Sequence, residues 1–267
     1  MDTTQNTVTS KDGTKIVYDK QGEGPAVILV DGALCTRSFG SKPELVTLLA
    51  PHFTIYSYDR RGRGDSGDTK PYAVEREIED IEALIDEAGG VAGLYGHSSG
   101  AALALEAAVT LGDKIKKIAM FEAPYNDDRE AQRGWREYTQ QLTKLLAADR
   151  RGDAIALFMA LVGMPADQIE GMRRAPMWPV LEAIAPTLAY DHIAIKGEDG
   201  TIPTERAARL TVPALVMNGG ASFPFMYDTA RALSKAMPHA QLRTLEGQRH
   251  DVSPEVLAPV LVAFFSA

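Results

Sequence analysis

Short apolar runs alternate with helical patterns along most of the chain. The runs lack a strict alternation of apolar and polar residues, which is typical of strands in a parallel sheet covered on both faces. They lie at Ala26–Asp31, Phe53–Asp59, Val91–Tyr95, Ile115–Glu122, Ala214–Asn218 and Gln241–Leu245. The helical patterns lie at Pro43–Ala50, Ala73–Ala88, Ser99–Leu111, Phe225–Met237 and Pro254–Phe265. This order predicts an α/β fold with a mostly parallel sheet flanked by helices.

Two segments depart from this alternation of strands and helices. Near the start, Asp12-Gly13 separates two short alternating runs, Thr7–Ser10 and Thr14–Asp19, which predicts a β-hairpin. Residues 124–210 contain no strand-like run, and their clearest patterns are helices over Arg129–Arg150 and Ala154–Val162. A helical insertion there lies over the carboxyl ends of the strands, where ligands bind in open α/β sheets. We therefore predict a helical lid over 124–210, inserted into a core of residues 1–123 and 211–267.

The lid is rich in aromatic residues and methionine. These aromatic and methionine residues include Trp135, Phe158, Met159, Met164, Met172, Met177 and Trp178. They either form the insertion's own core or line a pocket for a non-polar ligand. Trp178 lies two residues after one proline and directly before another, a poor context for a buried helix, so we predict that it is a pocket wall. Phe158, Met177 and His192 are the other candidate ligand contacts in the lid.

Composition and charge exclude several classes of protein. The 267 residues are 45% hydrophobic and 24% charged, as expected of a globular chain, and the net charge is −8. An acidic chain without a run of Lys and Arg is a poor partner for nucleic acid or an anionic membrane. With Cys35 as its only cysteine, it forms no internal disulfide, and we expect neither a metal site nor a cofactor. Without an export signal or membrane span, a cytoplasmic protein is expected.

The pentapeptide Gly96–Gly100 reads GHSSG and carries the candidate nucleophile, Ser98. It follows an apolar strand and opens an Ala-rich helix, the context in which a G-x-S-x-G pattern exposes a serine on a sharp turn. The flanking glycines are needed because side chains there would collide with neighbouring backbone. The alternative, a serine that only caps the helix, explains neither glycine. The backbone N–H of Ser99 is a candidate donor to a developing oxyanion.

The chain resembles the α/β-hydrolase superfamily along nearly its whole length. The matching landmarks, in the family's order and spacing, are VILVDGA (27–33), YDRRGRGDSG (58–67), GHSSG (96–100), VPALVMNGG (212–220) and LEGQRHDVSPE (245–255). The resemblance implies a nucleophile, an acid and a histidine in that chain order. The family's histidine follows the last strand, which implies that His250 is the general base.

The acid departs from the commonest pattern of the superfamily. The turn after the strand Ala214–Asn218 has no carboxylate, and Ser222 occupies the usual Asp position. Some members place the acid after the preceding strand, and here Glu122 ends that strand. We therefore predict that Glu122 orients His250. Asp228 lies too far into the next helix to be a natural substitute, and Asp31 is a weaker alternative.

The resemblance also assigns the oxyanion hole and one charged loop. The N–H of Ala33, with Gly32 second, joins that of Ser99 as a donor, and we expect Leu34 and Cys35 to line the pocket. The loop over 59–66 is charged, but in this family it is mostly a structural turn in which Arg and Asp pair locally. Its glycines match no nucleotide-binding pattern.

These features favour a serine hydrolase acting on a carboxylic ester or lactone. The Ser98, Glu122 and His250 layout, the Asp-Gly at the oxyanion turn and the Trp-bearing lid look most like zearalenone lactonases. The implied partner is a small, largely hydrophobic ester or lactone. Two alternatives stay open: hydrolysis of a carbon–carbon bond or another reaction on the same scaffold, and a ligand-binding relative without catalysis.

Overall fold

The computed structural model describes residues 6–39 and 43–267, and an eight-stranded sheet runs through this part of the chain. The spatial order is β1-β2-β4-β3-β5-β6-β7-β8. Neighbours from β4 through β8 pair in parallel, whereas β1 pairs with β2 and β2 with β4 in antiparallel register. The strands are β1 (Asn6–Thr9), β2 (Lys15–Gln21), β3 (Ala26–Val30), β4 (Thr54–Tyr58), β5 (Ala92–His97), β6 (Ile115–Phe121), β7 (Ala214–Gly219) and β8 (Ala240–Leu245). The α/β fold expected from the alternation is confirmed.

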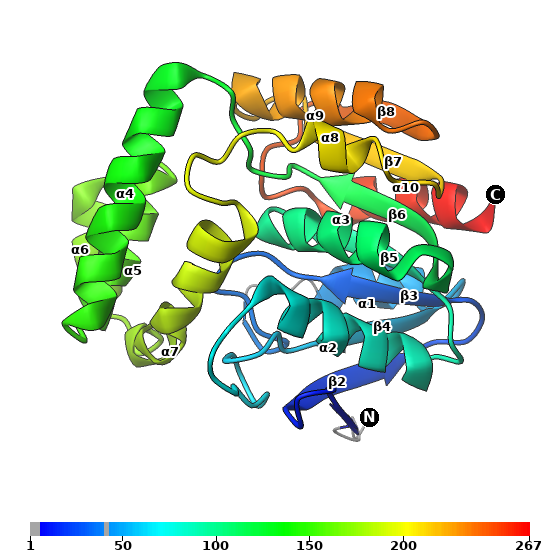
Figure 1. Cartoon of the computed structure of the whole chain (residues 1–267), viewed down its shortest axis with the longest axis horizontal. Helices are drawn as coiled ribbons and strands as arrows, with labels where there is room; N and C mark the ends of the chain where they lie inside the picture. Colours follow the sequence, from blue (N-terminus) through cyan, green and yellow to red (C-terminus); the bar gives the residue numbers. More distant parts are fainter. Residues whose placement is uncertain (1–5, 40–42) are drawn as a thin grey trace.

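Helices cover both faces of the sheet (Figure 1). On one face, α2 (Val74–Glu87), α3 (Ser99–Leu111), α8 (Thr204–Ala207) and α9 (Pro224–Ala236) share an apolar core with the strands. On the other face, α1 (Pro43–Leu49) and α10 (Pro254–Ser266) form a second core. Burial on both faces explains the continuous apolar runs of the central strands.

The segment 124–210, called the cap segment below, joins β6 to β7 and is helical. It contains α4 (Arg129–Ala147), α5 (Arg151–Leu161), α6 (Ala166–Arg173), α7 (Trp178–Ile184) and a π-helical stretch, Tyr190–Ile195, before α8. Figure 1 shows α4 to α7 together beside the end of the sheet. The division into a core and a lid stays a prediction, but these helices share an apolar cluster that is distinct from the two cores of the sheet.

Two helix boundaries in the cap segment differ from the pattern. The helix expected to run to Arg150 ends at Ala147, because Asp149 adopts a positive φ of 53°. The next helix begins at Arg151, three residues before the expected start. A residue in the left-handed region interrupts helical hydrogen bonding, and an apolar period does not reveal such a break.

Candidate active site

The GHSSG segment forms a sharp turn between a strand and a helix. β5 ends at His97, α3 begins at Ser99, and Ser98 between them has φ 57° and ψ −127°. A non-glycine residue in this region is strained, and such strain persists only where the surroundings enforce it. An added Cβ would collide with the carbonyl oxygen of Val30 at Gly100 and with that of Gly100 at Gly96. The close approach of β3 and α3 to this turn therefore requires both glycines.

Glu122 and His250 meet beyond the ends of their strands. Glu122 directly follows β6, with a φ of 50° and a fully buried side chain. Its Oε2 lies 2.6 Å from Nδ1 of His250, which stands on the loop between β8 and α10 and keeps 39% of its side chain exposed. A carboxylate at Nδ1 holds the ring proton there and leaves Nε2 free to accept one.

The turn after β7 supports Glu122 instead of supplying an acid. The backbone N–H of Gly219 donates to Oε1 of Glu122 at 2.8 Å, and the hydroxyl of Ser222 donates to Oε2 at 2.9 Å. Both oxygens of this buried carboxylate therefore have a hydrogen-bond donor. Sequence reasoning placed Ser222 at the usual acid position but missed this role, although its place in the same turn was the available signal.

His97, in the GHSSG turn, contacts the loop that bears His250. Nε2 of His97 lies 3.0 Å from the backbone oxygen of His250, and the two rings are 4.9 Å apart. His97 therefore contacts the backbone of the candidate base. The contact ties the end of β5 to the loop before α10.

The loop after β3 lies against Ser98. A Cβ added to Gly32 would be 3.1 Å from Cβ and 3.7 Å from Oγ of Ser98. Leu34, two residues on, has a φ of 58°, and its buried side chain turns into the cluster of the cap segment together with Ala33. The structure thus brings Gly32, one of the expected oxyanion residues, close to the candidate nucleophile Ser98, which directly precedes Ser99, the first residue of α3.

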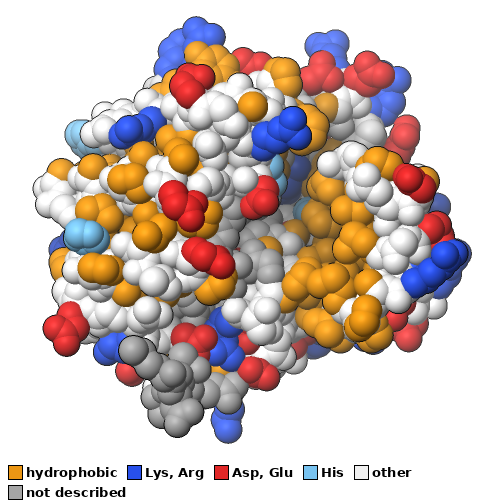
Figure 2. Space-filling view, turned by 180° about the vertical axis from the view of Figure 1, so that it is seen from behind, with side chains coloured by type: hydrophobic (Ala, Val, Ile, Leu, Met, Phe, Trp, Pro, Cys, Tyr) orange, Lys and Arg blue, Asp and Glu red, His pale blue; other side chains and the backbone are white. Residues whose placement is uncertain are grey.

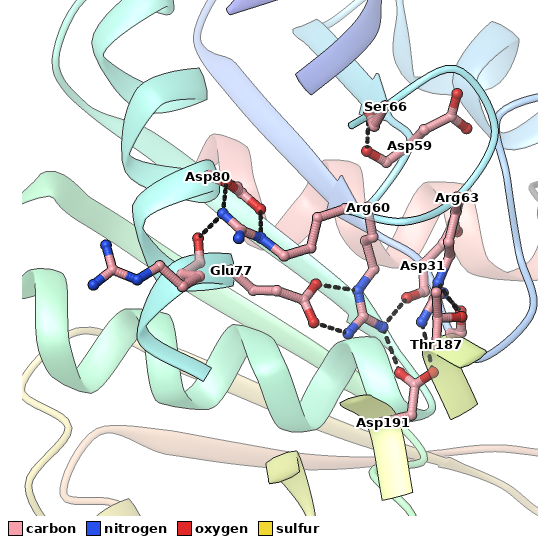
Figure 3. Close-up of polar contacts among 12 residues, drawn as sticks. Asp31, Asp59, Arg60, Arg63, Ser66, Glu77, Asp80, Thr187 and Asp191 are labelled. Carbon is pink, nitrogen blue, oxygen red and sulfur yellow. Dashed lines mark hydrogen bonds and ion pairs between the residues drawn. The ribbon is translucent and has the colours of Figure 1, made fainter. Parts of the chain in front are cut away.

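The arginines of the loop 59–66 are buried, and their expected local pairing is wrong (Figure 3). Arg60 donates to Glu77 and Asp191, Arg61 to Asp80 and Asp12, and Arg63 to Asp191. These partners come from the first hairpin, from α2 and from the cap segment. A buried guanidinium must be paired, and the fold supplies carboxylates that are remote in sequence.

A groove separates the cap segment from the rest of the molecule, and hydrophobic side chains gather along its cap side (Figure 2). Leu34, Trp178 and Phe158 belong to one apolar cluster, and Met177 is half-buried just before α7. Trp178 is only 5% exposed and starts α7, so the expectation that its prolines exclude it from a buried helix is wrong. Pro179 lies in the first turn, where a missing N–H costs nothing. Substrate contact by these residues stays a prediction.

Comparison with known proteins identifies the family. A family model described as "Alpha/beta hydrolase family" matches residues 32–262. The chain belongs to the α/β-hydrolase family. This hydrolase is 31% identical over 247 residues to a pimeloyl-[acyl-carrier protein] methyl ester esterase of Xanthomonas campestris, a match that covers 87% of this chain and 90% of the relative.

Solved structures agree with the hydrolase fold. An α/β hydrolase from Sphaerobacter thermophilus is 51% identical, with a TM-score of 0.85 over 97% of this chain and 100% of the other. A 2-hydroxy-6-oxo-6-phenylhexa-2,4-dienoate hydrolase from a Rhodococcus species is 21% identical, with a TM-score of 0.70 over 99% of this chain and 100% of the other. The second likeness shows the fold alone.

His192 of the hydrolase lies inside the cap segment among aromatic rings. Its Nδ1 is 2.9 Å from the hydroxyl of Tyr138, and its ring centroid is 5.0 Å from that of Phe158. Burial lowers the pKa of His192 to about 3, although Asp191 opposes this shift. The ring is therefore neutral at ordinary pH and offers a polar edge within an apolar cluster.

Other chemistry finds little support in the described part of the hydrolase. Burial, with Asp31 second, raises the pKa of the Cys35 thiol to about 12, which disfavours a thiolate nucleophile. Residues 6–39 and 43–267 hold no cluster of three or more His, Cys, Asp or Glu suited to a metal ion. No helix within these ranges has both the length and the apolar character needed to cross a bilayer.

Replacing Trp178 with alanine is expected to destabilise the hydrolase by about 3–5 kcal/mol, because truncating a buried aromatic side chain leaves a cavity. Its Nε1–H also donates to Glu182 at 3.1 Å. Val180→Ala on the same helix is the control, since Val180 is 50% exposed and should change stability by less than about 1 kcal/mol. Urea unfolding measures both effects. Unchanged relative rates across a substrate panel in Trp178→Ala would remove the pocket role from this residue.

Lys196 is expected to make stability rise with pH in the alkaline range. Burial lowers the pKa of its ammonium to about 7, and Nζ lies 3.5 Å from the centroid of the Trp135 ring. Between this value and the unfolded pKa of about 10.4, the unfolded chain binds the extra proton. The free energy of unfolding should then increase with pH by up to about 1.4 kcal/mol per unit.

The Lys196→Met variant should lose this slope, whereas Lys235→Met at an exposed position on α9 should keep it. Urea unfolding at pH values from 7 to 10 provides the comparison. Equal slopes in Lys196→Met and the unmodified chain would show that Lys196 is not the titrating group.

Proposed function

We propose that the chain is a serine hydrolase that cleaves a carboxylic ester or lactone through an acyl-enzyme on Ser98. The observation that carries this proposal is the 2.6 Å contact between Nδ1 of His250 and the buried carboxylate of Glu122, on the same sheet edge as the strained turn of Ser98. A nucleophile, a base and a group that orients the base are the parts that acyl transfer requires.

In the acylation step, Oγ of Ser98 attacks the substrate carbonyl carbon while Nε2 of His250 accepts the hydroxyl proton. The imidazolium that forms is stabilised by the negative charge of Glu122. Collapse of the tetrahedral intermediate breaks the bond to the alkoxy oxygen, and His250 returns the proton to the departing alcohol. In a lactone the alcohol stays attached to the acyl group.

The oxyanion of the intermediate is stabilised by backbone donors. The N–H of Ser99 lies at the positive end of α3, and the N–H groups of Ala33 and Gly32 come from the loop beside Ser98. Water then attacks the acyl carbonyl, with His250 as its base, and hydrolysis frees Ser98. No metal or cofactor is needed in this sequence.

The proposed substrate is small and largely hydrophobic. The apolar cluster of the cap segment and the hydrophobic side of the groove favour a non-polar acyl or alcohol group (Figure 2). A methyl ester esterase among the relatives supports ester cleavage. The Glu122 position and the aromatic cap segment favour an aryl ester or a lactone like those of the zearalenone lactonases.

Turnover of p-nitrophenyl esters of increasing acyl length and of aryl lactones tests the proposal. We expect hydrolysis of esters or lactones, with faster turnover of hydrophobic substrates. A vinylogous 1,5-diketone in the same panel tests the carbon–carbon bond alternative, and turnover of that compound alone would replace the proposal. Tight binding without turnover of any member would support a ligand-binding relative.

A further inference from the structure

Two buried arginines hold the loop that carries the proposed oxyanion donors. Nη1 of Arg63 donates to the backbone oxygen of Gly32 at 2.6 Å, and Nη1 of Arg60 donates to that of Asp31 at 3.2 Å. Both arginines are about 1% exposed and come from the loop after β4 (Figure 3). Each therefore fixes one carbonyl of the segment beside Ser98.

These two carbonyls share peptide units with the proposed donors. The C=O of Gly32 and the N–H of Ala33 belong to one planar unit, as do the C=O of Asp31 and the N–H of Gly32. In a trans peptide the two groups point in opposite directions, so holding the oxygen sets the direction of the N–H. Arg63 thereby orients the first proposed donor and Arg60 the second.

Two side chains of the cap segment also accept hydrogen bonds from these guanidinium groups. Asp191, on the π-helical stretch, accepts from Nη1 of Arg60 at 2.7 Å and from Nη2 of Arg63 at 2.5 Å. Thr187 accepts from Nε of Arg63 at 3.2 Å. Asp191 is fully buried, so these charge-assisted bonds meet no competition from water.

The charges within this cluster balance. Glu77 pairs with Arg60 through both carboxylate oxygens, so two cations face two anions. Burial raises the pKa of Asp191, but Arg60 and Arg63 outweigh it and hold the pKa at about 2. The Asp191 carboxylate is therefore ionised at ordinary pH, and its removal leaves an excess buried positive charge.

We infer that Asp191 is a positioning residue that couples the cap segment to the oxyanion hole through Arg60 and Arg63. Docking of the stretch Tyr190–Ile195 on the core fixes both guanidinium groups, which fix the peptide units of residues 31–33. Donors to a developing oxyanion are effective only when preorganised. The inference rests on the proposed hydrolase function and adds to it a link between the cap segment and catalysis.

Asp191→Asn tests the link, and Asp80→Asn is the matched control. Asp80 is an equally buried carboxylate that pairs with Arg61 of the same loop, and the hydrogen bonds of Arg61 go to Asp80, Asp12 and the backbone oxygen of Arg76. We expect Asp191→Asn to lower kcat on a p-nitrophenyl ester by about 10–100-fold with KM changed less than threefold. Asp80→Asn should keep kcat within about threefold of the unmodified chain. A purely structural role would lower stability in both variants and kcat in neither.

Thr187→Val is a milder second variant, because it removes a single acceptor from Arg63 and keeps the side-chain shape. It should fold normally and lower kcat by about threefold to tenfold. If Asp191→Asn does not fold, Thr187→Val decides, and an unchanged kcat in it overturns the inference.

Amide hydrogen exchange of the peptide covering residues 31–36 gives a readout that needs no turnover. Exchange there should accelerate at least tenfold in Asp191→Asn, or in Thr187→Val, and not in Asp80→Asn. An unmodified chain that hydrolyses nothing contradicts the proposed function, and the exchange arm still decides the coupling. The coupling between the cap segment and the oxyanion hole is overturned by unchanged exchange in residues 31–36, or by equal kcat losses in the Asp191 and Asp80 variants.

Discussion

Ser98→Ala is expected to lower ester hydrolysis by at least about a thousandfold while leaving the thermal midpoint within a few degrees. Removal of the nucleophile of such a triad leaves only the contributions of the oxyanion donors and of binding. The smaller alanine side chain at the strained turn removes one hydroxyl and no apolar packing, so the fold should persist. Initial rates on p-nitrophenyl esters and calorimetric scans measure the two effects.

The control for this variant is Ser234→Ala on α9, whose hydroxyl donates to the backbone of Arg231 and lies outside the site. It should keep full activity. Residual activity of Ser98→Ala within tenfold of the unmodified chain would remove Ser98 from the mechanism.

Glu122→Gln is expected to cost about a hundredfold or more in kcat with little change in KM. The amide keeps the shape of the side chain and can still accept the N–H of Gly219. It carries no charge to stabilise the imidazolium, and its NH₂ group can turn towards His250 and favour the wrong tautomer. Steady-state kinetics on one ester substrate separate kcat from KM.

Glu106→Gln is the matched control, because Glu106 is a largely buried carboxylate that pairs with Arg206 at 2.8 Å. Its loss should affect stability and leave kcat unchanged. Equal losses of kcat in the two variants would show that the effect of Glu122 is one of general stability. Asp228→Asn and Asp31→Asn should cost much less than Glu122→Gln, and a larger loss in either would move the acid to that residue.

The fold was predictable because its signals are local. Each central strand is an apolar run of a few residues, and the glycines around Ser98 report a close approach that only glycine allows. The contact of Glu122 with His250 agrees with an expectation from the family's chain order, together with the absence of a carboxylate at Ser222. Its catalytic role stays a proposal.

The contacts between the cap segment and the core were not predictable in the same way. Asp191 pairs with Arg60 and Arg63 across more than 120 residues, and no periodicity or motif records such a pairing. Local pairing of these arginines was expected from the resemblance to the family, which carries no information on the residues of this chain's cap segment. Trp178 was misjudged because prolines break helices in their interior but are tolerated in the first turn.

Labelling with a p-nitrophenyl alkylphosphonate tests the central claim most directly. The phosphorus of this reagent is attacked by an activated serine, which releases p-nitrophenolate and leaves a stable phosphonyl ester. Intact mass followed by peptide mapping should find one adduct per chain, on Ser98, with none in Ser98→Ala and slower formation in Glu122→Gln. An unmodified chain that acquires no adduct, or acquires it on another residue, contradicts the account.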